Sequence, residues 1–394
     1  MFEALEGRVL LNGQILAFTG GKGNDRIEVR LNGNNVEIVA NGKVRTSAAL
    51  GTLKGILIDG AAGDDNITIP DAVNLPTTLN GGSGNDVLSG GKSNDLMDGG
   101  PGSDTALGNA GNDTLIAFQP TSATSTDRDR LSGGTGRNRL WCKAGTIGGN
   151  RSFRTFLRND RLRYSDGARN LDTTISGFGQ CQYSGSRWGD YFDGSTFSGN
   201  CTIVGAGGND TLKGGLAADR IDPGAGSDNV NCGPGDDTLL CQYSNFGSPG
   251  PDRDLFAGGP GDDLLDCNFG GTVFLTDRGF GPTLNDPHAL ASGFEQAICR
   301  GSDQNDTIDP FMFAGRCTLL GNGGDDTLYG NNLPGLLDGG PGNDFLFGFG
   351  GNDTLLGGDG NDNLNGGDGA DRIDGGPGID QNVADPSDTV LNVP

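Results

Sequence analysis

The chain has 394 residues, with 51 acidic and 27 basic side chains, a formal net charge of −24 and 75 glycines. This glycine share is far above the roughly 7% of an average protein. A nucleic-acid-binding function is not expected, because it requires a basic surface. No apolar run reaches the length of about 18 residues that a membrane span needs. Of the acidic residues, 46 are Asp and five are Glu, which indicates a short carboxylate at fixed turn positions.

Residues 1–80 are expected to form an N-terminal β region with isolated repeats. The alternation in RIEVRLNGNNVEIVANGKV (26–44) predicts strands joined by an Asn-Gly turn. The opening FEALEGRVLL (2–11) resembles a short motif, roughly LEPRVLL, at the start of many exported bacterial repeat proteins, without the usual basic stretch before it. No basic region followed by an apolar stretch, the pattern of a cleavable secretion signal, is visible.

A nine-residue period, G-G-x-G-x-D-x-U-x with U apolar, dominates the rest of the chain. Strict phase holds over 81–116, 205–240 and 321–383, and isolated copies stand at 20–28, 60–68, 258–266 and 301–309. In each unit, six residues are expected to form a turn and three a short strand whose middle residue points inward. Two units would then complete one coil, and no segment has a helical period. The predicted fold is all-β, a parallel β-roll or β-solenoid with decorated irregular rungs.

A longer repeat lies over the nine-residue one. Residues 175–214 align with 291–330 at an offset of 116, with 19 of 40 positions identical, and 127–142 match 252–267 at an offset of 125. The irregular stretches are therefore decorated copies of one module. The predicted division is an N-terminal region (1–80), two solenoid modules (81–204 and 205–320) and a C-terminal β-roll run with its tail (321–394).

The repeat places oxygen ligands at the density that calcium requires. Glycine allows positive φ and lets carbonyl oxygens point inward, and these carbonyls and the Asp carboxylate are hard ligands. Turns n and n+2 should stack about 4.8 Å apart on one edge. Unit charges about 5 Å apart repel by roughly 3 kcal/mol at an effective dielectric constant near 20. Calcium turns this repulsion into attraction, so we expect folding to depend on calcium.

These in-phase copies resemble the RTX, or hemolysin-type, calcium-binding repeat family, and the resemblance implies several calcium ions bound in the turns of a parallel β-roll. Carried over position by position, it implies these carboxylate ligands: Asp86, Asp95, Asp104, Asp113, Asp210, Asp219, Asp228, Asp237, Asp263, Asp326, Asp344, Asp353, Asp362, Asp371 and Asp380.

Some turns depart from the family pattern. Ser93 and Ala217 replace the fourth glycine, Asn138 takes the Asp position of unit 133–141, and unit 330–338 has lost its Asp. These departures argue against calcium at those turns. The isolated turns at Asp25 and Asp65 lack a partner at n+2 in the sequence, and we interpret them as structural.

A catalytic role is not expected. The one histidine, His288, excludes HExxH zinc sites and histidine-based triads, and we interpret it as a loop residue. The alternative is a calcium-dependent extracellular polysaccharide-acting enzyme that uses a pair of carboxylates on the solenoid face. A membrane-damaging toxin would need long apolar segments, which the sequence lacks.

Residues 118–204 hold 12 Lys and Arg against 7 Asp. We interpret the Arg-rich region 128–187 as a solvated face in which Arg neutralises Asp where calcium is lost. The alternative is a docking surface for an anionic polysaccharide or for another copy of the chain. The nearby aromatic residues are interpreted as rung fillers, with sugar stacking as the alternative: Trp141, Tyr183, Trp188 and Tyr191.

The eight cysteines form no CxxC pair, which argues against zinc and favours disulfides in an oxidising compartment. Cys299 and Cys317 are one 18-residue coil apart, and Cys181–Cys201 occupies nearly the same place one module earlier. These are the two preferred bonds, and the pairing of the other four cysteines stays open. Together these patterns predict an exported, extracellular or cell-surface calcium-binding solenoid with a structural, surface or adhesive role.

Overall fold

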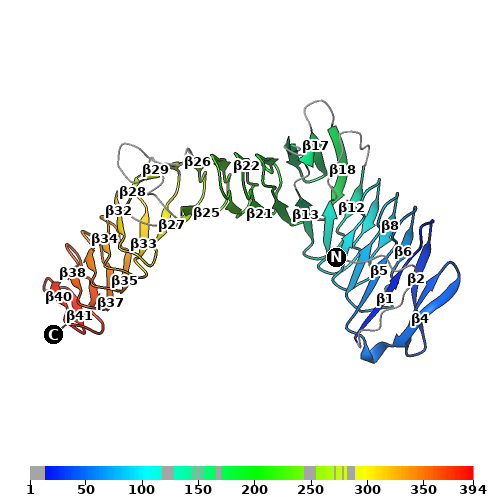
Figure 1. The fold of residues 1–394 in the computed structure, drawn as a ribbon, viewed down its shortest axis with the longest axis horizontal. Coiled ribbons are helices and arrows are strands. Elements are labelled where there is room, and N and C mark those ends of the chain that lie inside the picture. Colours follow the sequence, from blue (N-terminus) through cyan, green and yellow to red (C-terminus); the bar gives the residue numbers. More distant parts are fainter. Residues whose placement is uncertain are drawn as a thin grey trace. The chain divides into compact units, whose positions relative to one another are not determined.

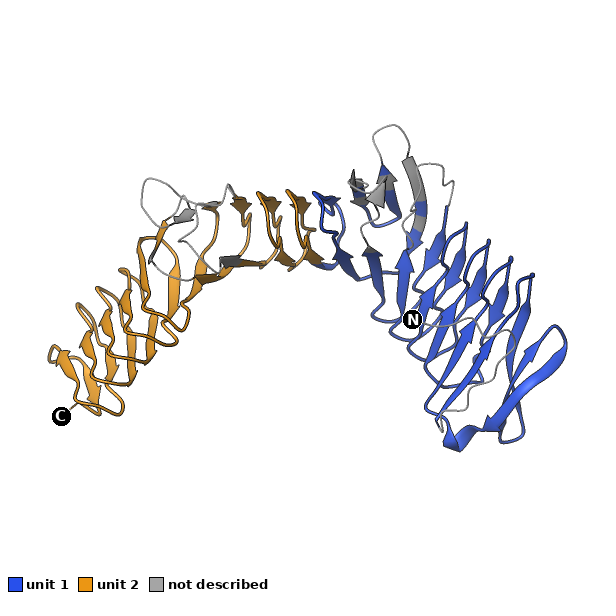
Figure 2. Cartoon of the chain, viewed as in Figure 1, with its two compact units in different colours: residues 1–202 blue, residues 203–394 orange. Residues whose placement is uncertain are grey.

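The computed structural model describes residues 14–117, 128–143, 146–147, 151–152, 154–165, 170–243, 254–269, 272–276, 279–281 and 289–393. Their regular structure is β-strand apart from one short 3-10 turn, η1 (Leu50–Thr52), which confirms the predicted all-β class. Within these residues, no helix has the length and apolar character needed to cross a membrane. The chain divides into two compact units, residues 1–202 and 203–394 (Figure 2).

Each nine-residue unit forms the expected turn and short strand. β8 (Val87–Ser89) and β10 (Thr105–Leu107) pair in parallel with Val87 opposite Thr105, which lies 18 residues later, so two units make one coil. β9 (Leu96–Asp98) and β11 (Thr114–Ala117) pair in the same way in the other sheet. The middle residue of each strand points between the sheets, and Leu88 and Leu115 are 0% exposed. One apolar side chain per unit makes a thin core that only stacked rungs can stabilise.

In residues 1–202, parallel strands build two sheets (Figure 1). The first sheet contains β1 (Ile15–Thr19), β5 (Gly55–Asp59), β7 (Thr77–Asn80), β9, β11, β13 (Arg139–Lys143) and β19 (Gln180–Ser184). The second contains β2 (Arg26–Asn32), β6 (Asn66–Thr68), β8, β10, β12 (Arg130–Ser132) and β18 (Asn170–Ser176). β20 (Tyr191–Asp193) and β21 (Asn200–Val204) follow.

The N-terminal region adds an antiparallel meander to this pattern. β2 pairs with β3 (Asn35–Ala40), and β3 pairs with β4 (Lys43–Ala49). Asn41 and Gly42 connect the last two strands, and both have positive φ, 52° and 76°. An Asn-Gly pair in this conformation is typical of a tight hairpin turn. The alternation in residues 26–44 therefore predicted these strands correctly.

In residues 203–394, the same two-sheet arrangement continues through the C-terminal run. The first sheet contains β23 (Arg220–Asp222), β25 (Thr238–Tyr243), β27 (Leu264–Phe269), β31 (Gln296–Arg300), β33 (Arg316–Leu320), β35 (Leu336–Pro341), β37 (Thr354–Asp359), β39 (Arg372–Asp374) and β41 (Thr389–Leu391). The second contains β22 (Thr211–Lys213), β24 (Asn229–Asn231), β26 (Asp254–Ala257) and β30 (Ala289–Ser292), then β32 (Thr307–Met312), β34 (Thr327–Tyr329), β36 (Phe345–Phe347), β38 (Asn363–Asn365) and β40 (Gln381–Val383).

Each unit interrupts its second sheet once with an antiparallel excursion. In the first unit, β18 pairs with β17 (Arg161–Ser165), β17 pairs with β16 (Arg154–Leu157), and β16 pairs with β20. A short hairpin of β14 (Thr146–Ile147) and β15 (Arg151–Ser152) comes before these strands in the chain. In the second unit, β30 pairs with β29 (Gly279–Gly281), β29 pairs with β28 (Thr272–Thr276), and β28 pairs with β32. The strands after the excursions, β19 and β31, begin 116 residues apart, at Gln180 and Gln296. The decorated rungs of the two units thus contain the same kind of antiparallel excursion.

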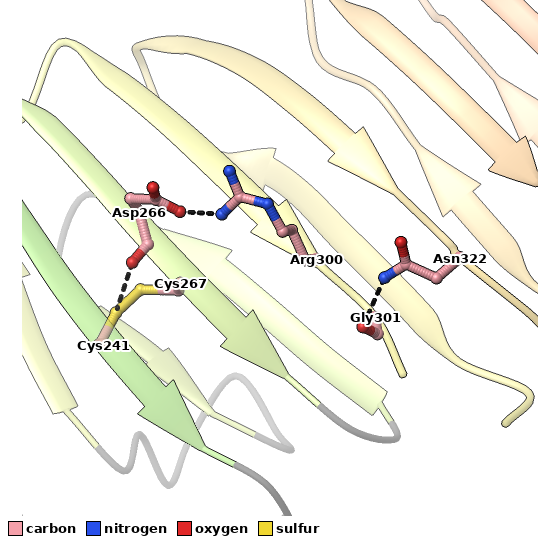
Figure 3. A network of polar contacts seen from close by, with 6 residues as sticks. All are labelled: Cys241, Asp266, Cys267, Arg300, Gly301 and Asn322. Carbon is pink, nitrogen blue, oxygen red and sulfur yellow. Dashed lines mark hydrogen bonds and ion pairs between the residues drawn. A yellow bond between two sulfur atoms is a disulfide. The ribbon is translucent and has the colours of Figure 1, made fainter. Parts of the chain in front are cut away.

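The cysteine pairing differs from the prediction. The disulfide joins Cys241 to Cys267, which lie opposite each other on β25 and β27 (Figure 3). The predicted bonds Cys299–Cys317 and Cys181–Cys201 are wrong, because all four are buried thiols. The coil between β31 and β33 is longer than 18 residues, so Cys317 stands opposite Ala297 and Cys299 opposite Leu319. Cys181 instead hydrogen-bonds to the thiols of both Cys142 and Cys201.

Candidate metal sites in the turns

The Asp side chains of the turns form columns along the edges of the solenoid. The main-chain N–H of Asp344 donates to Oδ1 of Asp362 over 2.8 Å, and that of Asp362 donates to Oδ1 of Asp380 over 3.0 Å. Asp86 donates in the same way to Asp104 over 2.7 Å. Each partner lies 18 residues later, in the next turn of the same edge. One carboxylate oxygen of each turn therefore joins it to its neighbour in the stack.

All the predicted ligands lie in such turns, and each is at most 5% exposed. Their second oxygen, Oδ2, is the distinctive group. It is buried and has no hydrogen-bond donor in Asp86, Asp113, Asp237, Asp263, Asp326, Asp344, Asp353, Asp362, Asp371 and Asp380, and the same holds for Asp65, which is not among the predicted ligands. A buried carboxylate oxygen without a donor is costly unless a cation is close to it.

A second oxygen stands beside most of these groups. Oδ2 of Asp344 and the carbonyl oxygen of Gly357 both lie within 3.0 Å of the place that a Cβ would take on Gly339. Oδ2 of Asp86 and the carbonyl oxygen of Gly99 converge on Gly81 in the same way. Glycine is thus needed at Gly81 and Gly339, because two acceptor oxygens fill the space that a side chain would take. Two acceptors facing one point is an arrangement that a cation stabilises.

Burial sets the charge of these carboxylates when no cation is present. It raises the pKa of Asp326 to about 7, although a hydrogen bond from the N–H of Asp306 opposes it, and the carboxylate of Asp344 raises it further. Burial also raises the pKa of Asp113 and Asp353 to about 7 and that of Asp344 to about 6. The ionised form, which a metal needs, is therefore disfavoured in the empty turn.

Some turns close their carboxylate without a cation, and we call these closed turns and the others open turns. In turn 90–95, Oδ2 of Asp95 accepts the N–H of Gly91 over 2.9 Å, and its Oδ1 accepts the N–H of Thr77 over 3.0 Å. Oδ2 of Asp219 accepts the N–H of Gly215, and Oδ2 of Asp306 accepts that of Ser302. Asp95 and Asp219 belong to the predicted ligands, so the structure separates them from the rest.

The fourth residue of the unit largely explains this division. In open turns it is a glycine, and in most of them its φ is strongly positive, as 136° at Gly84 and 149° at Gly360, a conformation that L side chains rarely adopt. The closed turns have Ser93, Ala217 and Gln304 at this position. Turn 20–25 is closed as well, with Oδ2 of Asp25 accepting the N–H of Gly21 over 2.7 Å, although its fourth residue is Gly23.

The fifth residue of the unit has a structural role that the sequence pattern left as x. The N–H of Asn343 donates to Oδ1 of Asp325 over 2.8 Å, and the N–H of Asn361 donates to Oδ1 of Asn343 over 3.0 Å. Ile379 then donates to Asn361 over 3.0 Å. An exposed column of amides and carboxylates thus runs beside the buried one. The recurrence of Asn or Asp directly before the repeat Asp is the signal for it.

Asp65 was interpreted as structural from the sequence, but it belongs to the buried column. Its N–H donates to Oδ1 of Asp86 over 2.7 Å, and its Oδ2 faces the carbonyl of Gly81. The separation of 21 residues hides this stacking from a nine-residue count. In unit 330–338, which lacks its Asp, Gly335 takes the position and donates its N–H to Asp353 over 2.8 Å.

The described residues contain no cluster of three or more His, Cys, Asp or Glu side chains that could hold a metal ion. A cation in an open turn would take one or two carboxylate oxygens and complete its shell with main-chain carbonyls. This set of hard oxygen donors fits calcium rather than a transition metal. The motif 2–11 and His288 lie outside the described residues, as do the side chains of Arg151, Arg154 and Arg169.

The comparison with protein families agrees with this chemistry. The family model of the RTX calcium-binding nonapeptide repeat (four copies) matches residues 77–106, 124–141, 197–230, 204–239, 318–332, 336–364 and 347–381. The chain therefore carries RTX calcium-binding nonapeptide repeats, in a β-roll or β-solenoid fold. None of the curated proteins gives a match.

Proposed function

We propose that the open turns bind calcium and that the chain completes its fold when they are filled. The observation that carries this proposal is the pair of acceptor oxygens, Asp Oδ2 and a glycine carbonyl, that face each other without a donor. In the empty turn the pKa of the carboxyl group is raised, and a bound calcium ion would instead stabilise the ionised carboxylate by neutralising its charge. Because each rung buries so few apolar atoms, neighbouring rungs would gain much of their stability from the ions between them.

The proposed carboxylate ligands are the predicted residues of the open turns together with Asp65. From the predicted set they are Asp86, Asp113, Asp237, Asp263, Asp326, Asp344, Asp353, Asp362, Asp371 and Asp380, and Asp104, Asp210 and Asp228 are proposed on their position in the repeat alone. Asp95 and Asp219 are left out, because their Oδ2 atoms already accept main-chain N–H groups.

We infer an exported protein with a structural, surface or adhesive role. Sites made mainly of carbonyl oxygens with one or two carboxylates suit weak binding, and extracellular calcium modules work at a Kd of about 10⁻⁴–10⁻³ M. Such sites would stay empty in a cytosol and fill outside the cell. Fractionation of the producing cells tests this, because recovery only from the cytosol would contradict export.

We further propose the Arg-rich face as a docking surface for an anionic polysaccharide. Arg128, Arg130, Arg137 and Arg139 are exposed on or beside β12 and β13. Arginine guanidinium groups pair well with carboxylate and sulfate groups. The test is retention on an immobilised anionic polysaccharide at fixed calcium, for the natural chain and a variant with these four residues changed to Gln. Equal retention would contradict the proposal, and a change in oligomeric state instead would favour self-association.

The placement of the ions is tested by a crystal structure grown with calcium, with anomalous scattering recorded at long wavelength. We expect peaks between Asp Oδ2 and the facing carbonyl in open turns, for example beside Gly81 and Gly339. Closed turns such as 90–95 serve as the internal control and should show none. Peaks absent from open turns, or equally strong in closed ones, would contradict the assignment.

A further inference from the structure

One turn occurs in both halves of the chain with a different side chain at the position of the repeat Asp. The two copies also differ at Thr135/Pro260 and at Arg137/Asp262. Residues 133–138 precede β13, and residues 258–263 precede β27, at an offset of 125. The turn that follows each of them in the stack is short and irregular, and its first residues are Gly177 and Gly293. The two copies thus form a matched pair inside one protein, with Asn138 and Asp263 at the same position.

In the second copy, Asp263 presents an unpaired buried oxygen. Asp263 is 0% exposed, and its Oδ1 accepts the N–H of Asp237 over 2.9 Å. Its Oδ2 has no donor and lies, with the carbonyl oxygen of Gly293, within 3.0 Å of the Cβ position of Gly258. The N–H of Asp263 donates to Oε2 of Glu295 over 2.9 Å, so Glu295, which is itself exposed, accepts the hydrogen bond that the next Asp accepts in the regular stacks.

In the first copy, an amide group fills the same space. Oδ1 of Asn138 accepts the N–H of Asp113 over 2.9 Å, as Asp263 accepts that of Asp237. Its Nδ2 donates to the carbonyl oxygen of Gly177 over 3.1 Å and to that of Gly134 over 3.3 Å. The counterpart of Glu295 at the offset of 116 is Gly179, which has no side chain. Every polar atom of the Asn138 side chain is therefore satisfied without a metal.

The two arrangements differ in the atom that faces the carbonyl. An NH₂ group is a donor, so it pairs directly with the carbonyl oxygens. A carboxylate oxygen is an acceptor, so it faces the carbonyl across a space that only a proton or a cation can bridge. The turn of Asn138 therefore needs no cation, whereas the turn of Asp263 does.

We propose that Asp263, Glu295 and the carbonyl of Gly293 form a calcium site where a stack of regular turns meets an irregular one, and that Asn138 makes its counterpart a permanently metal-free turn. This inference rests on the proposed calcium binding of the open turns. It adds Glu295 as a ligand, and it assigns to Asn138 the position that a calcium ion holds elsewhere in the column.

The test counts bound calcium per chain by equilibrium dialysis and atomic emission on the full-length protein. Asp263→Asn should lose one ion relative to the natural chain, and Asn138→Asp should gain one. Glu295→Gln should lower the affinity for one calcium ion, so that this ion binds last and is lost first, without changing the affinity for the others. The matched control is Asn112→Asp, which adds the same charge on the exposed column, where Oδ1 of Asn112 accepts the N–H of Arg137 over 2.8 Å, and should change nothing.

The outcomes separate this inference from the function on which it rests. A natural chain that binds no calcium would contradict both. A natural chain that binds calcium, with unchanged counts in Asp263→Asn and Asn138→Asp, would overturn only the present inference. If Asn138→Asp fails to fold at saturating calcium by far-ultraviolet circular dichroism, the inference is also contradicted, because an added ion should stabilise that turn as it does its counterpart.

Discussion

The main-chain N–H of Asp344 donates to Oδ1 of Asp362, 2.8 Å away, while Oδ2 of Asp344 remains buried without a donor. One oxygen of each carboxylate thus builds the stack, and the other creates a demand for a cation. These different roles of the two oxygens explain why the repeat uses Asp and not Asn. An Asn side chain would accept the same hydrogen bond with Oδ1 and would pair its NH₂ group with the facing carbonyl, so it would need no cation.

Asp344→Asn should therefore remove one calcium ion and at the same time make the metal-free chain more stable. The new Nδ2 can donate to the carbonyl of Gly357, and one hydrogen bond contributes about 1 kcal/mol net. Asp344→Ala is the matched control. It removes the acceptor of the N–H of Asp326 as well and should cost about 1–3 kcal/mol with or without calcium. Urea unfolding in chelator and in excess calcium measures both, and equal effects of Asn and Ala would contradict the explanation.

Gly84→Ala should destabilise the chain and weaken calcium binding in its turn. Gly84 has φ 136°, and a Cβ there would meet the main chain of Gly63. The backbone conformation alone costs about 1–3 kcal/mol, and the contact adds to it. Gly23→Ala is the control, since Gly23 is the fourth residue of a closed turn with nothing within 4 Å of its Cβ position. Thermal unfolding midpoints that fall equally in both variants would argue against the open-turn geometry.

The calcium-free chain should be more stable in mild acid than at neutral pH. Burial raises the pKa of Asp326 and Asp353 to about 7, from an ordinary value of 3.8. Between these values the folded chain binds more protons than the unfolded chain, so stability is lost as pH rises through the window. With excess calcium the order should reverse, because protons compete with the ion for the same oxygens. Melting curves at pH 5 and pH 8, with chelator and with calcium, test both signs, and parallel shifts would contradict the prediction.

The sulfur chemistry gives a separate check. After alkylation in denaturant without reductant, peptide mapping should find Cys241 linked to Cys267 and should find the label on Cys299 and Cys317. The physical reason is the register of β25 and β27, which places Cys241 directly opposite Cys267. A Cys299–Cys317 linked peptide would contradict this pairing.

The nine-residue period was sufficient to predict the coil, the inward-facing residues such as Leu88 and Leu346, and the buried Asp columns. It could not predict where coils are longer than 18 residues. Asp65 stacks on Asp86 across 21 residues, and Cys317 stands opposite Ala297 across 20, so spacing alone missed the stacking partner of Asp65 and assigned the disulfides wrongly.

The state of each carboxylate was only partly visible in the sequence. The loss of the fourth glycine at Ser93 and Ala217 did indicate closed turns, because the positive φ of the open turn is then costly. Turn 20–25 shows the limit of this signal, since it is closed although Gly23 is present. The role of Glu295 depends on an irregular turn that no repeat pattern describes, and only the three-dimensional stack brings it to Asp263.

The most direct test of the account is far-ultraviolet circular dichroism of the full chain during calcium addition and then chelation. Because buried Asp oxygens face carbonyl oxygens in many successive rungs, we expect a large gain of β signal on adding calcium at neutral pH. We also expect the loss of that signal when a chelator removes the ion. A β spectrum that is complete before calcium is added, and unchanged after chelation, would contradict the central claim.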